Sequence, residues 1–171
     1  MDTTSTKNIA GIKAAIITVD SRVVDGTKAD KGAEVAAGLI EAEGAEVIRR
    51  VVIDDLAAPL RGEFQRALDS GARLIVTVGS TGVSARNIVP ETTSAICDVE
   101  LPGIAEQIRA EGLRNTPQSV LSRAVVGVTS RTTRGAVVVN TPSSAGGVKD
   151  ALKVVIPLLP YIYEQLDQTE A

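Results

Sequence analysis

Residues 73–91 read RLIVTVGSTGVSARNIVPE, and this stretch decides the fold. Its first six residues form an almost continuous apolar run, which is typical of a strand that is covered by helices on both faces. The run ends at Gly79, and a segment rich in glycine and hydroxyl side chains follows. Pro90 then begins a new helical stretch. A buried strand, a polar turn and a helix in this order predict one unit of an α/β protein.

The same alternation extends in both directions along the chain. Gly44 and Gly71 stand where left-handed residues would end two helices. The last helix is expected to bend or restart at Pro157 and Pro160. The pattern predicts a three-layer α/β fold, with a mainly parallel sheet and helices on both faces. Strands are predicted at 12–19, 47–53, 73–78, 125–128 and 135–139, and helices at 31–43, 58–70, 104–112 and 148–166.

A single domain is expected over residues 10–167, with a flexible N-terminus at 1–9 and a polar tail at 168–171. The first residues contain no apolar segment, so we expect no signal peptide. The longest apolar runs have the length of strands, so we expect no membrane span. Cys97 is the only cysteine, which excludes a disulfide within the chain and favours a cytoplasmic location.

The titratable residues exclude several classes of function. The chain contains no histidine, which rules out histidine-based triads, histidine metal ligands and an imidazole base. For the same reason we expect Cys97 to be a buried apolar residue and not a nucleophile. A formal net charge of -3 is too small to indicate nucleic-acid binding by bulk electrostatics. Any anionic ligand must therefore be held by local groups.

Two loops have a composition suited to phosphate binding. The first, at 78–84 (VGSTGVS), offers backbone N–H groups and three hydroxyl groups, although it matches neither the Walker A pattern nor the dinucleotide fingerprint. The second, at 140–147 (NTPSSAGG), ends at a helix N-terminus, where free N–H groups and the helix dipole favour an anion. Taken alone, a tight turn explains the first loop, and an N-cap by Ser143 or Ser144 explains the second.

Asp54 and Asp55 follow the second predicted strand. Carboxylates at the carboxyl end of a strand can hold Mg²⁺, although a solvated turn with a helix N-cap explains the pair equally. Ligands of open α/β sheets bind at this edge, so we expect both loops and the aspartates to meet there.

Several segments, in the right order, resemble the molybdopterin adenylyltransferase (Mog/MoaB) family. TVGSTGVSARNIVPETT (77–93) resembles the family's G-G-T-G-x-x-x-R-D-x-T-P-E stretch, and LPGIAE (101–106) resembles its I-P-G-x-x-E. LSRA (121–124) matches its L-S-R segment, and VNTPSS (139–144) resembles its N-L-P-G-S. DSR (20–22) and DKG (30–32) fit its opening motifs.

The resemblance implies a homotrimeric α/β domain that transfers AMP from ATP to the terminal phosphate of molybdopterin, with Mg²⁺ and release of pyrophosphate. It also implies hand-off of the product to a molybdenum-insertion protein. By resemblance, catalysis is assigned to Asp54 and Asn87, and Mg²⁺ binding to Asp54 and Asp55. Arg22, Arg86 and Arg123 could hold phosphates or could be surface or subunit-contact residues. The expected substrate-binding residues are Ser21, Gly79, Ser80, Thr81, Gly82, Ser84, Arg86, Ser122, Pro142, Ser143, Ser144, Gly146 and Gly147.

The chain departs from the family pattern at Asn87, where an aspartate is expected. A carboxamide keeps an oxygen but loses the charge, so it is a poorer Mg²⁺ ligand. Ser80 also replaces a glycine of the family pattern. Two alternatives to an active adenylyltransferase therefore stay open. One is a non-catalytic molybdopterin-binding protein that carries or stores the cofactor, and the other is a different nucleotide-handling α/β protein.

Overall fold

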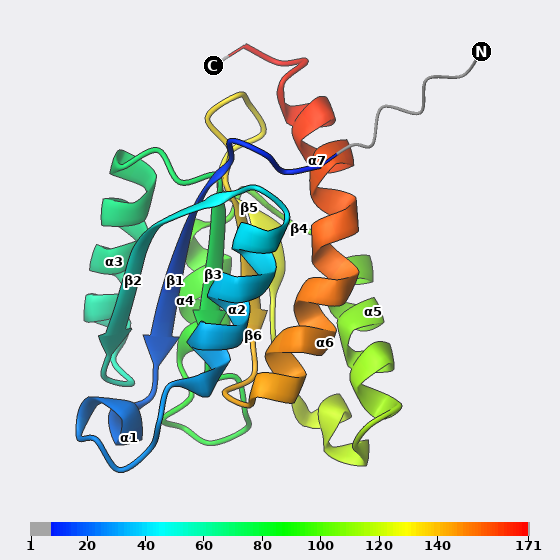
Figure 1. The fold of residues 1–171 in the computed structure, drawn as a ribbon. Helices are drawn as coiled ribbons and strands as arrows, with labels where there is room; N and C mark the ends of the chain where they lie inside the picture. The colour runs from blue at the N-terminus through cyan, green and yellow to red at the C-terminus, as the bar shows by residue number, and fades with distance from the viewer. Residues whose placement is uncertain (1–7, 171) are drawn as a thin grey trace.

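A computed structural model describes residues 8–170. At its centre lies one six-stranded sheet with the strand order β2-β1-β3-β6-β5-β4 (Figure 1). The first four strands in this order are parallel to one another, β5 pairs antiparallel with β6, and β4 pairs antiparallel with β5. The predicted mainly parallel sheet is confirmed. The strands are β1 (Lys13–Val19), β2 (Glu46–Ile53), β3 (Leu74–Val78), β4 (Val99–Glu100), β5 (Val126–Val128) and β6 (Val137–Thr141).

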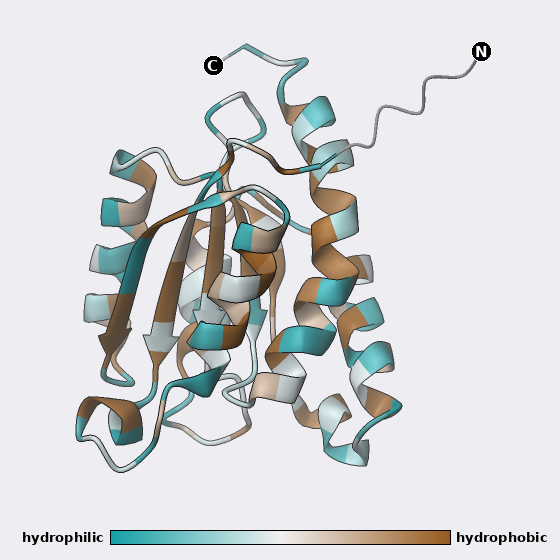
Figure 2. Ribbon diagram, in the orientation of Figure 1, coloured by the Kyte–Doolittle hydropathy of each residue, from teal (hydrophilic) through white to brown (hydrophobic). Residues whose placement is uncertain are grey.

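Helices cover both faces of the sheet and form the outer two layers (Figure 1). Helices α2 (Lys31–Ala42), α5 (Pro102–Leu113) and α6 (Ala145–Val155) pack on one face. Helices α3 (Ala57–Asp69) and α4 (Val89–Ile96) pack on the other. Figure 2 shows the apolar residues gathered in the sheet and on the helix surfaces that face it.

Alternation along each strand divides the core into two parts. Ile16 is buried with the first group of helices, and its neighbour Ile17 is buried with the second. Successive residues of a strand point to opposite faces, so a strand that is buried on both faces must be apolar throughout. This requirement explains the continuous apolar runs of β1 and β3.

Most predicted helix ends are confirmed. Gly44 and Gly71 have φ angles of 83° and 82°, the left-handed conformation expected after a helix. The expected restart in the C-terminal helix is also present, since a 3₁₀ turn (η2, Ile156–Leu158) separates α6 from α7 (Leu159–Leu166). The helix predicted at 104–112 begins two residues earlier, at Pro102, because a proline is tolerated in the first turn, where its missing N–H costs nothing.

Three short elements were not predicted from the sequence. They are α1 (Ser21–Val24), β4 and the 3₁₀ helix η1 (Pro117–Leu121). None of them buries a residue, so none has the periodic apolar pattern from which elements are predicted.

The folded domain begins before residue 10. Ile9 is 1% exposed and belongs to the core that α2 and α6 cover. Residues 1–7 of the expected flexible N-terminus and residue 171 of the expected tail lie outside the described residues. Within the tail, the carbonyl oxygen of Thr169 accepts a hydrogen bond from the N–H of Thr133 at 3.1 Å. Among residues 8–170, no helix has the length and apolar character needed to cross a membrane.

The carboxyl ends of the parallel strands meet at one edge of the sheet, at the bottom of Figure 1. The register aligns Val19 with Ile53 and Val78 with Thr141, so these strands end side by side. The segments 20–30, 54–56, 79–88 and 142–144, which follow these four strands, therefore gather at one end of the molecule. In open α/β sheets this edge is where ligands bind.

Candidate functional site

Gly79 makes the turn that leaves β3. Its N–H donates to the carbonyl oxygen of Thr141 at 2.9 Å, which ties the end of β3 to the end of β6. Its φ angle is 98°, and a Cβ atom at this position would lie 2.6 Å from the carbonyl oxygen of Val19. Only glycine fits such a conformation and such a close approach of two backbones.

Ser80 adopts a left-handed conformation that side chains rarely take, with φ 57°. Its hydroxyl accepts a hydrogen bond from the N–H of Ile88 at 3.2 Å, and its carbonyl accepts one from Val89 at 3.3 Å. Each bond is worth about 1 kcal/mol, similar to the cost of the conformation. These bonds explain how a serine is accommodated where the family pattern has a glycine.

The side chain of Asn87 shapes the loop from inside. Its Oδ1 accepts a hydrogen bond from the N–H of Gly82 at 2.9 Å. Its own N–H donates to the carbonyl of Ser84, also at 2.9 Å. The side-chain oxygen expected to act in catalysis therefore closes the loop at 79–88 across its middle, a contact that an aspartate could also make.

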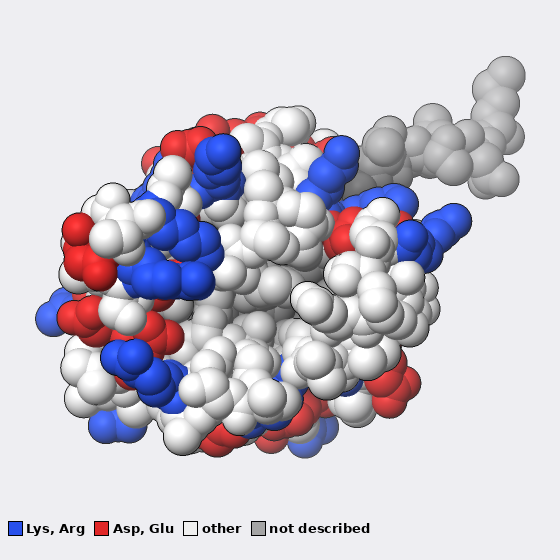
Figure 3. Space-filling model, turned by 90° about the horizontal axis from the view of Figure 1, so that it is seen from below, with Lys and Arg blue, Asp and Glu red and all other residues white. Residues whose placement is uncertain are grey.

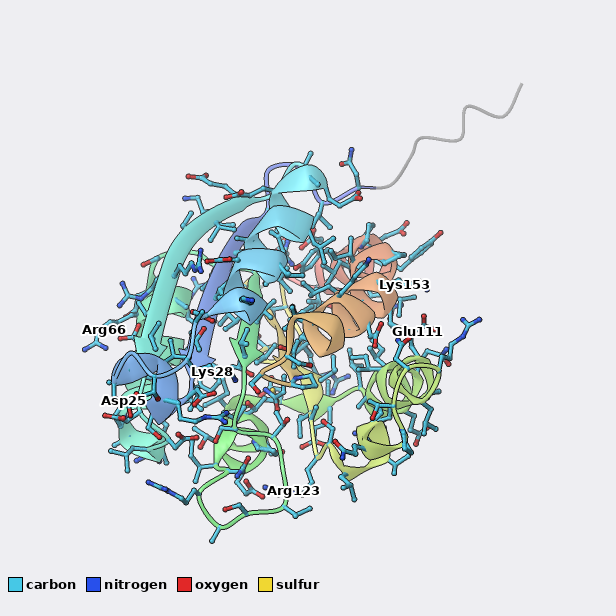
Figure 4. The ribbon with its side chains drawn as sticks, turned by 60° about the horizontal axis from the view of Figure 1, so that its bottom comes forward. Asp25, Lys28, Arg66, Glu111, Arg123 and Lys153 are labelled. Carbon is cyan, nitrogen blue, oxygen red and sulfur yellow. The ribbon has the colours of Figure 1, made fainter. Side chains whose placement is uncertain are left out.

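Arg123 braces the same loop from outside (Figure 4). Its Nε donates to the carbonyl of Gly82 at 2.8 Å, and its Nη2 donates to the carbonyl of Asn87 at 2.9 Å. An ion pair with Glu91 uses the remaining end of the guanidinium and lowers the pKa of Glu91. Arg123 is therefore a partly exposed residue whose donors hold the loop, and its expected roles in phosphate binding or in a subunit contact stay predictions.

A buried polar network anchors the second loop. Asn140 is fully buried, and its Nδ2 donates to the hydroxyls of Thr77 and Thr93 at 3.0 and 2.8 Å. Its Oδ1 accepts from the N–H of Val125 at 3.0 Å. Every polar atom of this side chain is thus used to join β6, β3, α4 and the segment before β5. This network fixes the position from which residues 141–147 leave the sheet.

Ser144 is the N-cap of α6, as one of our interpretations proposed. Its hydroxyl accepts a hydrogen bond from the N–H of Gly147 at 3.1 Å. The helix that begins here is eleven residues long, and its first N–H groups face the same edge of the sheet as the loop at 79–88.

The structure separates the two neighbouring aspartates. Asp55 lines the cleft between the loops, and its Oδ2 accepts hydrogen bonds from the N–H and the hydroxyl of Ser21 at 3.0 and 2.9 Å. Asp54 is exposed and does not contribute to the cleft wall, although its carbonyl accepts a hydrogen bond from Leu56. Of the two carboxylates predicted at this position, Asp55 is the one that faces the site.

Asp20 is a second carboxylate in the cleft wall, and the site residues predicted from the sequence do not include it. It is 6% exposed and accepts hydrogen bonds from Arg22 (Nε, 3.0 Å) and from Lys28 (Nζ, 2.9 Å). The Arg22 hydrogen bond, supported by Lys28 and opposed by burial, holds the pKa of Asp20 well below its usual value. Asp20 directly follows β1, and this position at the carboxyl end of a strand could have indicated from the sequence that it belongs to the site.

Replacing Asp20 by asparagine tests this arrangement through pH. Because the pKa of Asp20 is depressed in the folded state, its contribution to stability is present above the unfolded pKa of about 4 and is lost as the pH falls further. We expect Asp20→Asn to be about 1–2 kcal/mol less stable than the wild type at pH 7, because Arg22 is largely exposed. The difference should shrink towards pH 2. Urea unfolding from pH 7 to 2 measures it.

Asp98 offers a control, since it is exposed and has no hydrogen-bonding side-chain partner within the described part of the chain. Asp98→Asn should match the wild type at every pH. A destabilisation by Asp20→Asn that stays constant from pH 7 to 2 would contradict the assigned ion pairs.

Two cavities adjoin between the loops, and Figure 3 shows this end of the molecule hollowed near its middle. The first cavity, called the phosphate cleft after the ligand expected from the sequence, has a volume of ≈ 350 Å³. The second, the α5–α6 cavity, has a volume of ≈ 440 Å³ and lies between α5, η1 and the start of α6. Thr81, Gly82 and Pro142 line both, so the two cavities share a wall.

The structure brings together most of the predicted site residues. Arg22, which was considered a phosphate-binding candidate, also lines the phosphate cleft. Gly79 lies beneath the loops and lines neither cavity, like Asp54. Residues of the α5–η1 segment and Asp150 line the second cavity and were missed from sequence. The predicted residues in the phosphate cleft are Ser21, Asp55, Ser80, Thr81, Gly82, Ser84, Arg86, Asn87, Pro142 and Ser143. Those in the α5–α6 cavity are Thr81, Gly82, Ser122, Pro142, Ser144, Gly146 and Gly147.

Cys97 lies away from both cavities. It is half-buried, and burial raises the pKa of its thiol to about 11. A thiol in this state is a poor nucleophile. Cys97 was expected to be buried and is half-buried, packed against the core that α3 and α4 cover, and its raised pKa agrees with the expectation that it is not a nucleophile.

Comparisons with known proteins identify the family and the fold. Residues 15–161 match the family described as "Probable molybdopterin binding domain". A molybdopterin adenylyltransferase from Pyrococcus furiosus is 31% identical over 144 residues, which cover 84% of each chain. A crystal structure of a molybdopterin biosynthesis protein from Mycobacterium abscessus superposes with a TM-score of 0.81 at 32% identity. That match covers 90% of this chain and 95% of the other.

Some relatives are longer than this chain. A molybdenum cofactor biosynthesis bifunctional protein from Synechococcus elongatus is 28% identical over 160 residues. The match covers 94% of this chain but 49% of that protein, and the chain spans about half the length of several relatives that it matches.

Proposed function

The chain belongs to the probable molybdopterin binding domain family, and from this premise we propose that it binds molybdopterin and adenylylates it with Mg-ATP. The products are adenylyl-molybdopterin and pyrophosphate. The proposal places the protein late in molybdenum-cofactor biosynthesis. The relative from Pyrococcus furiosus is named a molybdopterin adenylyltransferase, and this name supports the proposed activity.

The observation that carries this proposal is the pair of adjoining cavities at the carboxyl edge of the sheet. A phosphorylated heterocycle needs one polar site with N–H donors and one larger site with apolar walls. The phosphate cleft is lined by the loop at 79–88, Ser143 and Arg86, and the α5–α6 cavity adjoins it across Gly82. Backbone N–H groups and Arg86 suit the binding of phosphates.

The residues of the cleft fit a Mg²⁺ ion. Within residues 8–170, no three acidic, cysteine or histidine side chains form a complete ligand set. Mg²⁺ does not need one, because it is usually held by one or two carboxylates together with substrate phosphates and water. Asp55 would supply the carboxylate, since its Oδ1 has no hydrogen-bonding partner among the described residues. The ion would offset negative charge on the phosphates of ATP.

The transfer needs little acid–base chemistry from the protein. An oxygen of the terminal phosphate of molybdopterin forms a bond to the α-phosphorus of ATP, and the bond from that phosphorus to the bridging oxygen of the β-phosphate breaks. Pyrophosphate leaves with the electron pair. The nucleophile is already an anion, so a chain without histidine can hold and align the two phosphates by itself.

Asn87 favours a second candidate, a non-catalytic molybdopterin-binding protein that carries or stores the cofactor. Its carboxamide carries no charge, and its Oδ1 already accepts a hydrogen bond from the N–H of Gly82. Among residues 8–170, the carboxylates that line the cleft are Asp20 and Asp55, and Asp20 is occupied by Arg22 and Lys28. A binding protein would keep both cavities and lack turnover.

A homotrimer, as expected from the resemblance, is part of the proposal. Exposed apolar side chains at Val120 and Leu121, 56% and 57% exposed, support a subunit contact beside the α5–α6 cavity, which Leu121 also lines. Hand-off of the product to a molybdenum-insertion protein completes the proposed role.

Pyrophosphate release with molybdopterin and Mg-ATP tests the proposal, with Asn87→Asp measured beside the wild type. We expect the wild type to release pyrophosphate only when molybdopterin is present. Aspartate can accept the same hydrogen bond from Gly82, so the loop should keep its shape in the variant. The added carboxylate should raise the rate by roughly 3- to 10-fold, as for one more favourable charge near the metal.

Calorimetric titration with molybdopterin separates the two candidates. If both proteins bind molybdopterin and neither releases pyrophosphate, the carrier function holds and adenylyl transfer is excluded. If neither binds it more tightly than unrelated nucleotides, the chain handles a different ligand.

A further inference from the structure

The α5–α6 cavity has an apolar floor and a polar rim. Ile108, Leu121 and Pro142 contribute apolar surface, and Gly112 packs closely against Ser119 in the same wall. Asn115 and Asp150 also line the cavity, and they are joined by a hydrogen bond from Asn115 Nδ2 to Asp150 Oδ2 at 3.0 Å. A volume of ≈ 440 Å³ is within the range of sites that bury a flat bicyclic ring.

Two charged side chains line this cavity, and they differ in what they offer a ligand. Arg109 uses its Nη1 to donate to the carbonyls of Ser122 and Ala124 at 3.3 and 3.2 Å, so it holds the chain that leads into β5. Asp150 forms no ion pair with any described residue, and its Oδ1 accepts no hydrogen bond from the part of the chain that the structure describes. The cavity therefore presents an acceptor at Asp150, and the guanidinium of Arg109 is anchored through its Nη1 to the backbone of the cavity wall.

Another carboxylate on this pair of helices, that of Glu111, does form ion pairs. Glu111, on α5, accepts hydrogen bonds from Lys153 at 2.6 Å and from Arg114 at 3.3 Å, and Figure 4 shows Glu111 and Lys153 between α5 and α6. Glu111 does not line the cavity. Of these two carboxylates, the paired one lies outside the cavity and the one without an ion pair lies in its wall.

We propose that Asp150 determines which heterocycle the cavity accepts, by receiving two N–H groups from a 2-amino-4-oxopyrimidine ring. Pterins and guanine contain this ring, in which a ring N–H and an amino group lie side by side. Two adjacent donors match the two oxygens of a carboxylate. The proposal rests on the proposed function and names the specificity determinant of the same site.

Adenine makes a poor match to this carboxylate. Its corresponding edge places an amino donor beside a ring nitrogen that is an acceptor, and that nitrogen would face a carboxylate oxygen with no hydrogen between them. A site built from buried or half-buried acceptors rejects ligands that leave them unpaired. Asp150 therefore gives the ligand a direction, with its aminopyrimidinone ring at α6 and its phosphate across Gly82 in the phosphate cleft.

Binding of three probes to the full chain tests this role. The fluorescence of 6-hydroxymethylpterin reports its own binding, and its displacement by guanosine or adenosine reports theirs. We expect the wild type to bind the pterin and guanosine about 10-fold more tightly than adenosine. Asp150→Asn has nearly the same size but offers one donor and one acceptor. It should weaken pterin binding roughly 10- to 100-fold and remove the preference over adenosine.

Glu111→Gln is the matched control, because it removes a carboxylate from the same pair of helices outside the cavity. It should bind all three probes within about 2-fold of the wild type. Circular dichroism checks that both variants are folded. Equal pterin affinity in wild type and Asp150→Asn overturns the proposal, as does a wild type without preference for pterin over adenosine.

Steady-state kinetics distinguishes this inference from the proposed function. Asp150→Asn should raise the KM for molybdopterin about 10-fold while kcat stays within about 2-fold, because the residue contacts the ring and not the reacting phosphates. An active wild type whose KM is unchanged in the variant would overturn the role of Asp150 and leave the adenylyl transfer intact. A wild type that prefers the pterin over adenosine but releases no pyrophosphate would overturn the adenylyl transfer and leave the role of Asp150 intact.

Discussion

Replacing Asp55 by asparagine is expected to slow pyrophosphate release about 100-fold, since the loss of several kcal/mol of charge stabilisation at a metal site has an effect of this size. Asp55 is the carboxylate of the cleft that has an oxygen free for a cation, because its Oδ2 is held by Ser21 and its Oδ1 faces no described donor. Asparagine keeps the size and one acceptor but removes the charge. Pyrophosphate release at saturating molybdopterin measures the effect.

Asp54→Asn is the matched control. Comparing the two variants shows whether the acidic residue of the site is Asp54, as the family resemblance implies, or Asp55, as the cleft lining indicates. Asp54 is exposed and lies outside the cleft wall, so its variant should keep the wild-type rate within about 3-fold. The family motif, taken residue by residue, assigns the catalytic role to Asp54 instead. A large loss in Asp54→Asn together with a mild one in Asp55→Asn would contradict the site as described.

Gly79→Ala is expected to lower the free energy of unfolding by about 3 kcal/mol or more. A side chain at φ 98° costs about 1–3 kcal/mol, and a Cβ atom placed 2.6 Å from the carbonyl oxygen of Val19 adds a similar amount through overpacking. Because Gly79 ties β3 to β6, the variant should also displace the loop at 79–88 and weaken molybdopterin binding. Urea unfolding and calorimetry measure the two effects.

Gly38→Ala is the control, and it is expected to raise the free energy of unfolding. Gly38 lies in α2, where a Cβ atom would meet nothing within 4 Å. Alanine should stabilise the helix there by about 0.5–1 kcal/mol. If Gly79→Ala were as harmless as Gly38→Ala, the close approach of β1 and β3 at the site would be wrong.

The main strands and helices could be predicted because each buries a long, regular apolar surface. β1 and β3 are apolar except for Lys13 and two threonines, and Gly44 and Gly71 mark helix ends through their left-handed backbone. β4 could not be predicted, because both of its residues are exposed and only the hydrogen bonds of β5 define it. Such an element depends on tertiary pairing and leaves no pattern in a single sequence.

The candidate site could be predicted as a set of loops but not as a set of roles. The glycine- and serine-rich segments were recognised from composition, and the edge at which they meet follows from parallel strands. The sequence could not distinguish Asp54 from Asp55, because a turn decides which of two neighbours faces the cleft. Asp150 carried no signal at all, since a lone aspartate on a helix is an ordinary surface residue.

Amide hydrogen exchange with and without molybdopterin tests most directly whether the two loops form one binding site. We expect exchange to slow together in the segments 79–87 and 142–147, because one ligand would span the phosphate cleft and the α5–α6 cavity. Protection of only one of these segments, or protection confined to the opposite end of the sheet, would contradict a shared cradle for the phosphorylated pterin.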